Sequence, residues 1–141
     1  MKTATNNNTA LFSAAGRILL ATIFIFSALG KIAAPAATIG YIQSSGLPLA
    51  TLGFALAVAV ELGGGLLLVL GVKTRWVAAA LAAFSVVTGL AFHNEVGDQN
   101  QLIHLLKNFA MAGGLLQVVA FGAGAFSIDA RTSRPAVRQA A

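Results

Sequence analysis

Four long apolar runs constrain the fold of this chain more than any other feature. They cover residues 10–30, 47–70, 76–92 and 102–121. Each has about 17 to 24 residues, the length that a helix needs to cross the hydrocarbon of a bilayer. Only 9% of the 141 residues are charged, whereas a soluble domain carries about a quarter. The sequence therefore predicts an all-α membrane protein built as a bundle of four transmembrane helices.

A moderately apolar segment, residues 33–48, separates the first two runs. Pro35 suits the first turn of a helix, and Gly46 suits its end. The isoleucines of the segment give it an apolar side, but three of its side chains do not suit a lipid core: Gln43, Ser44 and Ser45. We therefore expect a short interfacial helix at the membrane surface, between transmembrane helices 1 and 2.

The four runs belong to one transmembrane domain, residues 10–126. Residues 1–9 are polar and rich in asparagine, and we expect a flexible lead-in there. Residues 127–141 carry three arginines among small residues and are expected to form a disordered, basic cytoplasmic tail. These boundaries predict a single domain with short polar ends.

A cleavable signal peptide is an alternative interpretation of the first run. Lys2, the apolar run and Ala33–Ala37 resemble the three parts of such a peptide. Lys31, however, comes directly before the supposed cleavage site, and Arg17 lies in or next to the apolar region. Because three further runs can direct the chain to a membrane, we favour an uncleaved first helix.

Lysine and arginine are distributed unevenly between the two ends of the predicted helices. One end has Lys31 and Lys107, with Glu95 and Asp98 in its loop. The other end collects the remaining basic residues: Lys2, Arg17, Lys73, Arg75, Arg131, Arg134 and Arg138. Since cytoplasmic loops are enriched in lysine and arginine, both termini are expected in the cytoplasm. The placement of the basic residues behind the net charge of +5 thus orients the helices, and no nucleic-acid partner is expected.

Three charged residues fall within the apolar runs. Placing such a group in hydrocarbon costs about 2.5 to 3.5 kcal/mol, so each needs a partner or a wet cavity. Glu61 lies near the middle of the second run, and Lys107 lies about a turn and a half into the fourth. These two helices run in the same direction, so a Glu61–Lys107 ion pair is within reach. Arg17 can extend to the inner interface or turn inward to Glu61 or Gln117.

The intramembrane polar groups have two interpretations. They either lock the bundle together or line a cavity for a quinone, a lipid or a proton. The candidate pocket for the second interpretation consists of Arg17, Glu61, Lys107, Asn108 and Gln117. A second polar group is expected at the outer rim: Lys31, His93 and His104, near Asn94, Glu95 and Asp98.

No metal site is expected at this rim, because the spacing of its histidines and carboxylates matches no metal-binding motif. The His93–His104 pair does not suit haem either, since both residues lie at one mouth with little enclosing depth. The chain has no cysteine, which excludes disulfides and thiol redox chemistry. No nucleotide-binding or catalytic motif is present, so the sequence leaves open whether the protein is an enzyme.

Several glycines lie in or directly after the second, third and fourth runs. In a bilayer, small residues allow helix backbones to approach closely. We therefore expect helix packing, rather than ligand contact, at Gly63, Gly64, Gly65, Gly71, Gly89, Gly113 and Gly114.

Several short motifs occur in order between about residue 11 and residue 130. They are Gly16-Arg17, Gly30-Lys31, Gly46-Leu47-Pro48, Glu61-Leu62-Gly63-Gly64, Gly71 with Thr74-Arg75, Lys107-Asn108 with Gly113-Gly114, and Phe126-Ser127-Ile128-Asp129. Each motif alone is weak, but the ordered set resembles the DoxX family. The resemblance implies a four-helix protein of the bacterial cytoplasmic (inner) membrane. It also implies a polar signature without assigned catalytic roles: Arg17, Lys31, Glu61, Lys107 and Asn108.

Some DoxX proteins are linked to membrane-associated oxidoreductase complexes and to oxidative-stress defence. The resemblance therefore favours an accessory subunit that presents a polar pocket to a quinone or lipid and binds a partner oxidoreductase. Two alternatives stay open. One is a small transporter or proton-coupled carrier, which would need to form a homo-oligomer. The other is a purely structural protein whose only partner is the lipid bilayer.

Overall fold

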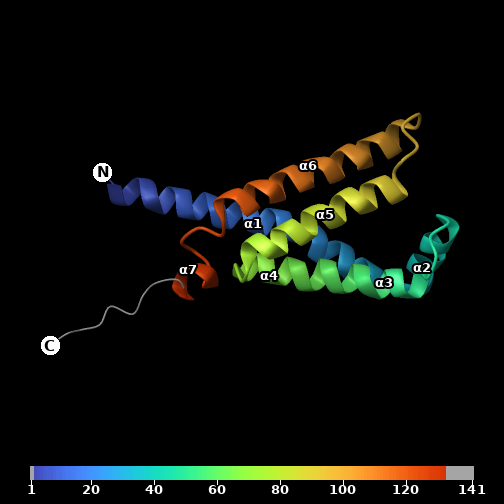
Figure 1. The fold of residues 1–141 in the computed structure, drawn as a ribbon, viewed down its shortest axis with the longest axis horizontal. Coiled ribbons are helices and arrows are strands. Elements are labelled where there is room, and N and C mark those ends of the chain that lie inside the picture. Colours follow the sequence, from blue (N-terminus) through green and yellow to red (C-terminus); the bar gives the residue numbers. More distant parts are fainter. Residues whose placement is uncertain (1, 133–141) are drawn as a thin grey trace.

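The computed structural model describes residues 2–132, and within them all regular structure is helical (Figure 1). The elements follow in the order α1 (Lys2–Ala33), α2 (Pro35–Ser44), α3 (Ala50–Val58), the π-helical turn η1 (Ala59–Gly63), α4 (Gly64–Leu70), α5 (Thr74–Phe92), α6 (Gln99–Phe121) and α7 (Ile128–Thr132). Within the described part, four helices are long and apolar enough to cross a membrane: Asn7–Ala33, Ala50–Leu70, Thr74–Phe92 and Gln99–Phe121. The predicted four-helix membrane fold is confirmed.

The two ends of the chain contain more helix than the sequence predicts. Helix α1 begins at Lys2, so residues 2–9 are helical and not a separate lead-in. The first glycine of the chain is Gly16 and the first proline is Pro35. Residues 2–9 therefore contain no helix-breaking residue that would separate them from the rest of α1. In the predicted tail, Ile128–Thr132 forms α7, while Arg134 and Arg138 lie outside the described residues.

The short helix α2 confirms the prediction of a helix between the first two spans. Ala34, the residue before Pro35, has a non-helical backbone (φ −138°, ψ 64°), and this ends α1. In Figure 1, α2 lies at the same end of the molecule as the α5–α6 connection. The ring of Tyr41 stacks on Phe92 with 5.5 Å between centroids, which ties α2 to the end of α5.

All four spans contribute to one apolar core. Its buried members are Ala21, Phe24, Leu68, Ala78, Leu81, Ala82, Ala112 and Leu115. Many large apolar side chains point outward instead, among them Phe12, Trp76 and Phe121, each 75% exposed or more. An exposed apolar surface of this extent suits contact with lipid.

Glycines provide the close helix contacts, but not at every predicted position. A Cβ added to Gly65 would lie 2.7 Å from Cγ1 of Ile25, so α1 and α4 pack through this glycine. Gly64, Gly71, Gly89 and Gly114 are similarly close to side chains of other elements. Gly63 and Gly113 have nothing within 4 Å of an added Cβ, so no such contact explains them.

Arg17 joins three segments at the end of the bundle that is remote from α2. Its side chain is buried, with 1% of the residue exposed. The guanidinium donates to the carbonyl oxygens of Leu68 (2.6 Å), Val69 (3.0 Å) and Phe126 (2.6 Å). The expectation that Arg17 turns inward to Glu61 or Gln117 is therefore wrong, because the guanidinium binds backbone carbonyls instead. Two of these carbonyls lie in the last turn of α4, where no further backbone N–H of the helix is available to them.

Asp129 completes this junction by capping α5 from a distant part of the chain. Its Oδ1 accepts from the backbone N–H of Lys73 and its Oδ2 from that of Thr74, both at 2.8 Å. Its own N–H donates to the carbonyl of Gly71 at 2.9 Å. Helix α5 has no acidic residue in its first turn and no side-chain cap from Lys73. Asp129 therefore supplies the acceptor and the negative charge that this helix start requires.

The Asp129 cap predicts a loss of stability in acid. Burial alone would raise the pKa of Asp129, but hydrogen bonds from Thr74 and Lys73 and the Arg17 charge outweigh it, and the pKa lies below its ordinary value. A carboxyl with a lowered pKa stabilises the folded state at neutral pH, and this contribution is lost as the pH falls below about 4. We expect Asp129→Asn to lower the midpoint of thermal unfolding in detergent at pH 7, with a smaller difference from the wild type at pH 3.

The matched control is Glu95→Gln, which removes an exposed carboxyl from the α5–α6 loop. This variant should unfold like the wild type at both pH values. An Asp129→Asn difference that stays constant between pH 7 and pH 3 would contradict the proposed linkage.

Candidate functional site

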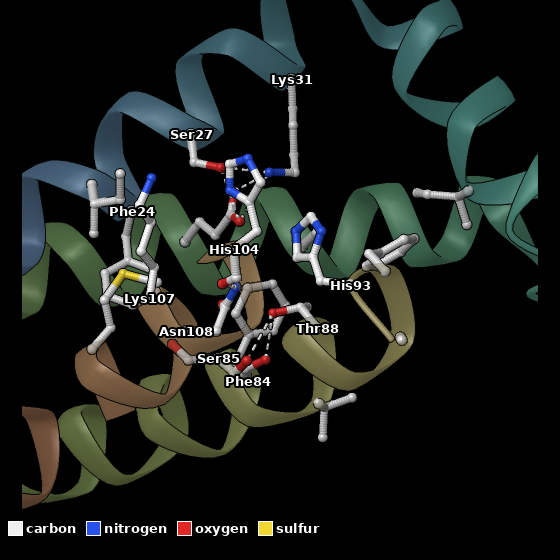
Figure 2. Close-up of a pocket in the computed structure, with 18 of the residues that line it drawn as sticks. Phe24, Ser27, Lys31, Phe84, Ser85, Thr88, His93, His104, Lys107 and Asn108 are labelled. Carbon is white, nitrogen blue, oxygen red and sulfur yellow. Dashed lines mark hydrogen bonds and ion pairs between the residues drawn. The ribbon is translucent and has the colours of Figure 1, made fainter. Parts of the chain in front are cut away.

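A large cavity opens between the helices at the α2 end of the bundle (Figure 2). Its volume is about 1290 Å³, and α1, α2, α3, η1, α5 and α6 all contribute to its wall. Most of the lining is aliphatic or aromatic. The charged and strongly polar groups in the wall are Lys31, Glu61, His93, His104, Lys107 and Asn108. The cavity thus combines a broad apolar surface with a few polar groups, which is typical of sites for small molecules.

Glu61 enters this wall from a π-helical turn. The turn η1 interrupts the second span between α3 and α4, with Glu61 at its centre. A π turn shifts the phase of the helix and is often found at functional sites. This π turn is not among the features that the sequence predicts. The available signal was the low helix propensity of the three glycines that follow at residues 63–65.

Glu61 forms an ion pair with Lys31 and not with Lys107. The Nζ of Lys31 donates to both carboxylate oxygens at 2.9 Å, and the Glu61 side chain is only 7% exposed. The predicted Glu61–Lys107 pair is wrong, since the described residues contain no ion pair of Lys107. Lys31 stands near the end of α1, and its side chain extends along the bundle (Figure 2), where its Nζ meets the Glu61 carboxylate.

Ser27 closes this polar group from one turn earlier on α1. Its Oγ donates to Oε1 of Glu61 at 3.2 Å and accepts from Nζ of Lys31 at 2.6 Å. Lys31 thus makes three contacts, one for each proton of its ammonium. The Lys31–Glu61–Ser27 cluster is therefore internally satisfied, as a charged group within a membrane bundle must be.

Two histidines stand beside each other at the cavity. The rings of His93 and His104 stack with 5.0 Å between centroids and 23° between planes. Nδ1 of His93 contacts Oε1 of Gln101 at 2.7 Å, which fixes this ring near the start of α6. Within residues 2–132, no three His, Cys, Asp or Glu side chains gather as a group that could hold a metal ion.

Two members of the sequence-predicted pocket lie elsewhere. Arg17 is at the opposite end of the bundle, in the junction with Phe126. Gln117 is exposed and absent from the cavity wall. It follows Asn108 by nine residues, about two and a half turns of helix, and so projects from the opposite face of α6. The cavity instead brings together the other three pocket residues and the three residues of the predicted rim.

Comparison of the sequence with known proteins identifies the family of this chain. The sequence model of the DoxX family matches residues 12–94, which is more than half of the chain and includes Arg17, Lys31 and Glu61. The chain belongs to the DoxX family. The matched segment is shorter than the resemblance over about residues 11–130 and does not include α6.

Two curated relatives extend the likeness along the DoxX fold. The inner membrane protein YqjF of Escherichia coli is 36% identical over 115 residues, which cover 80% of this chain and 85% of that protein. The inner membrane protein YphA of the same organism is 32% identical over 120 residues, covering 82% and 86% of the two chains. No solved structure shows a significant match.

Proposed function

We propose that this DoxX protein binds a membrane-soluble amphipathic molecule, a quinone or a lipid, in the cavity between its helices. In this role it would serve as an accessory subunit of a membrane-associated oxidoreductase system. The observation that carries the proposal is the cavity itself, with about 1290 Å³ of mainly apolar space and a few charged and polar side chains in its wall. An amphipathic molecule matches such a lining, since its tail can replace lipid contacts and its head can meet the polar groups.

The lining suits a quinone in particular ways. A quinone head offers carbonyl oxygens, which accept hydrogen bonds, and the wall has donors in Lys107, Asn108 and the histidine rings. The apolar wall, with Leu19, Ile23 and Phe84 among its members, can accommodate an isoprenoid tail. A bound quinone would supply two-electron redox chemistry to a partner enzyme, while this chain binds and orients it.

We also propose that the protein lies in the bacterial inner membrane with both termini in the cytoplasm. The relatives YqjF and YphA are inner membrane proteins. Arg131 of α7 and the N-terminal end of α1 lie at one end of the molecule, and α2 lies at the other (Figure 1). With the basic end inside, α2 and the mouth of the cavity face the periplasmic side, where α2 lies along the membrane surface.

A bulky side chain at Ala57 is expected to abolish ligand binding. Ala57 lines the cavity one helical turn before Glu61, so Ala57→Phe fills part of the space. Ala80→Phe is the matched control, because Ala80 is exposed on α5 and is absent from the wall. We expect mass spectrometry of protein purified in gentle detergent to find a co-purified quinone or lipid in the wild type and in Ala80→Phe. At least tenfold less should remain in Ala57→Phe.

The accessory role has a separate readout. In a strain that lacks the gene, the wild type and Ala80→Phe should restore membrane quinone reduction and resistance to oxidants, and Ala57→Phe should not. Equal ligand content in the two phenylalanine variants would argue against the cavity as the binding site. Equal restoration by both would argue against a role of the cavity in redox metabolism.

A further inference from the structure

The polar groups of the cavity differ in whether their hydrogen-bonding capacity is already used. The donor protons of Lys31 and Ser27 are all used within the cluster with Glu61, so an acceptor group of a ligand can bind there only by displacing one of these contacts. The groups on α6 are in a different state. Within residues 2–132, neither Nζ of Lys107 nor the ring nitrogens of His104 have a hydrogen-bond partner. One N–H of Asn108 donates to the carbonyl of His104, which leaves its second N–H available.

These available donors share one face of α6. His104, Lys107 and Asn108 are spaced i, i+3 and i+4, so their side chains are neighbours on the helix surface. All three line the cavity, and Figure 2 shows them together on its α6 side. The three side chains therefore form a single donor surface, which we name the α6 donor face.

The charge of the wall selects the kind of head group. Two lysines and one glutamate line the cavity, so its formal charge is +1 with the histidines neutral. The only carboxylate in the wall, that of Glu61, is neutralised by Lys31 at 2.9 Å. Lys107, whose side chain is exposed at the cavity, is therefore a cation without a counter-ion among the described residues. Such a cation is attracted to an anionic partner by direct charge interaction.

The loop carboxylates near this end do not supply that partner. Glu95 and Asp98 are exposed and neither belongs to the cavity wall. Oδ1 of Asp98 accepts from the backbone N–H of Gln101 at 2.8 Å, so this residue serves as the N-cap of α6. Neither loop carboxylate is paired with Lys107.

We infer that the α6 donor face binds the anionic oxygen head of an amphiphile, a phosphate or a carboxylate, whose acyl chain occupies the apolar part of the cavity. This inference rests on the proposed function for its cavity and narrows the ligand class. Lys107 supplies the charge, and Asn108 and His104 donate to the remaining oxygens. Two membrane components carry this chemistry: anionic phospholipids, through their phosphate, and free fatty acids.

The depth of the donor face is compatible with such a head group. Lys107 follows the cap residue Asp98 by nine positions, so its Cα lies about 13 Å along the helix from that end. Side chains on a helix lean towards its N-terminus, which for α6 is the Asp98 end. The ammonium of Lys107 can therefore meet a head group that enters from this surface without drawing it to the centre of the bilayer.

The test compares head groups at constant chain length. Purified protein in a non-ionic detergent would be titrated with dioctanoyl phosphatidylglycerol, dioctanoyl phosphatidylcholine, octanoate and a short-chain ubiquinone, with bound species counted by native mass spectrometry. We expect at least one of the two anions to bind about tenfold more tightly than phosphatidylcholine, as one charged hydrogen bond allows. Lys107→Met should reduce this preference to about twofold or less. The control Arg131→Met removes an exposed cation at the opposite end of the bundle and should preserve it.

Each outcome has a defined meaning. Preference for phosphatidylglycerol alone assigns a phospholipid, and preference for octanoate alone assigns a fatty acid. No preference for either anion, or a preference that Lys107→Met leaves intact, overturns the inference. One outcome is that ubiquinone binds, that Ala57→Phe blocks its binding, and that neither anion binds more tightly than phosphatidylcholine. In that case only the head-group inference fails. If Ala57→Phe changes the binding of no probe, the cavity is not a binding site and the proposed function fails with it.

Discussion

Arg17→Met is expected to lower the thermal unfolding midpoint of the protein severely. The guanidinium donates three hydrogen bonds to carbonyls of Leu68, Val69 and Phe126, from a side chain that is 1% exposed. Methionine fills a similar volume but donates nothing, so the buried carbonyl of Leu68 and the partly buried carbonyls of Val69 and Phe126 lose this partner. Hydrogen bonds to charged groups contribute about 1.5–3 kcal/mol each, and a total loss of about 3–5 kcal/mol follows if they are only partly additive.

Two further variants separate this effect from simple loss of charge. Arg17→Lys keeps the charge but lacks the planar fork that reaches carbonyls of two segments, so it should be intermediate. Arg131→Met removes an exposed arginine from the neighbouring α7 and should leave the midpoint nearly unchanged. Size-exclusion chromatography of detergent-solubilised protein after heating provides the measurement. If Arg17→Met and Arg131→Met lose the same small amount, the junction does not hold the bundle together.

Breaking the Lys31–Glu61 pair is expected to have the second large effect. Lys31→Met leaves a carboxylate that is 7% exposed without its cation, and such uncompensated buried charges cost about 3–5 kcal/mol. Glu61→Gln leaves the lysine unpaired, but a lysine at the end of α1 can turn towards water and should lose less. We therefore expect Lys31→Met to be the more damaging of the two single changes.

The double variant Lys31→Met/Glu61→Gln decides whether the two side chains act as a pair. Because the second change removes the orphaned carboxylate, the double variant should be more stable than Lys31→Met alone. Thermal midpoints of all four proteins complete the cycle. Strictly additive losses would show that the ion pair contributes nothing beyond its separate side chains. A parallel cycle with Lys107→Met and Glu61→Gln should be additive, since these residues form no ion pair.

The contrast between Lys31 and Lys107 shows which contacts at this site can be predicted from the sequence and which cannot. Both lysines are near the end of a span, and the sequence places Glu61 deeper than either. Depth along the helices favoured Lys107, because α6 and the second span run in the same direction. Depth alone does not fix the rotation of a helix about its axis, and the π turn at Ala59–Gly63 changes that rotation at Glu61 itself. The pair with Lys31 therefore emerges only from the packed helices.

The sequence by itself determined the four spans, the helix before the second span, the family and the set of polar residues that the bundle must accommodate. These follow from local rules: the length of an apolar run, the geometry of proline and the cost of charge in hydrocarbon. The tertiary structure alone decided which of these polar residues meet. It separated Arg17 and Gln117 from the cavity, joined Lys31 to Glu61 and left Lys107 without an ion-pair partner in the described part of the chain. The physical reason is that helix rotation and packing depend on contacts between segments far apart in sequence, which no local pattern encodes.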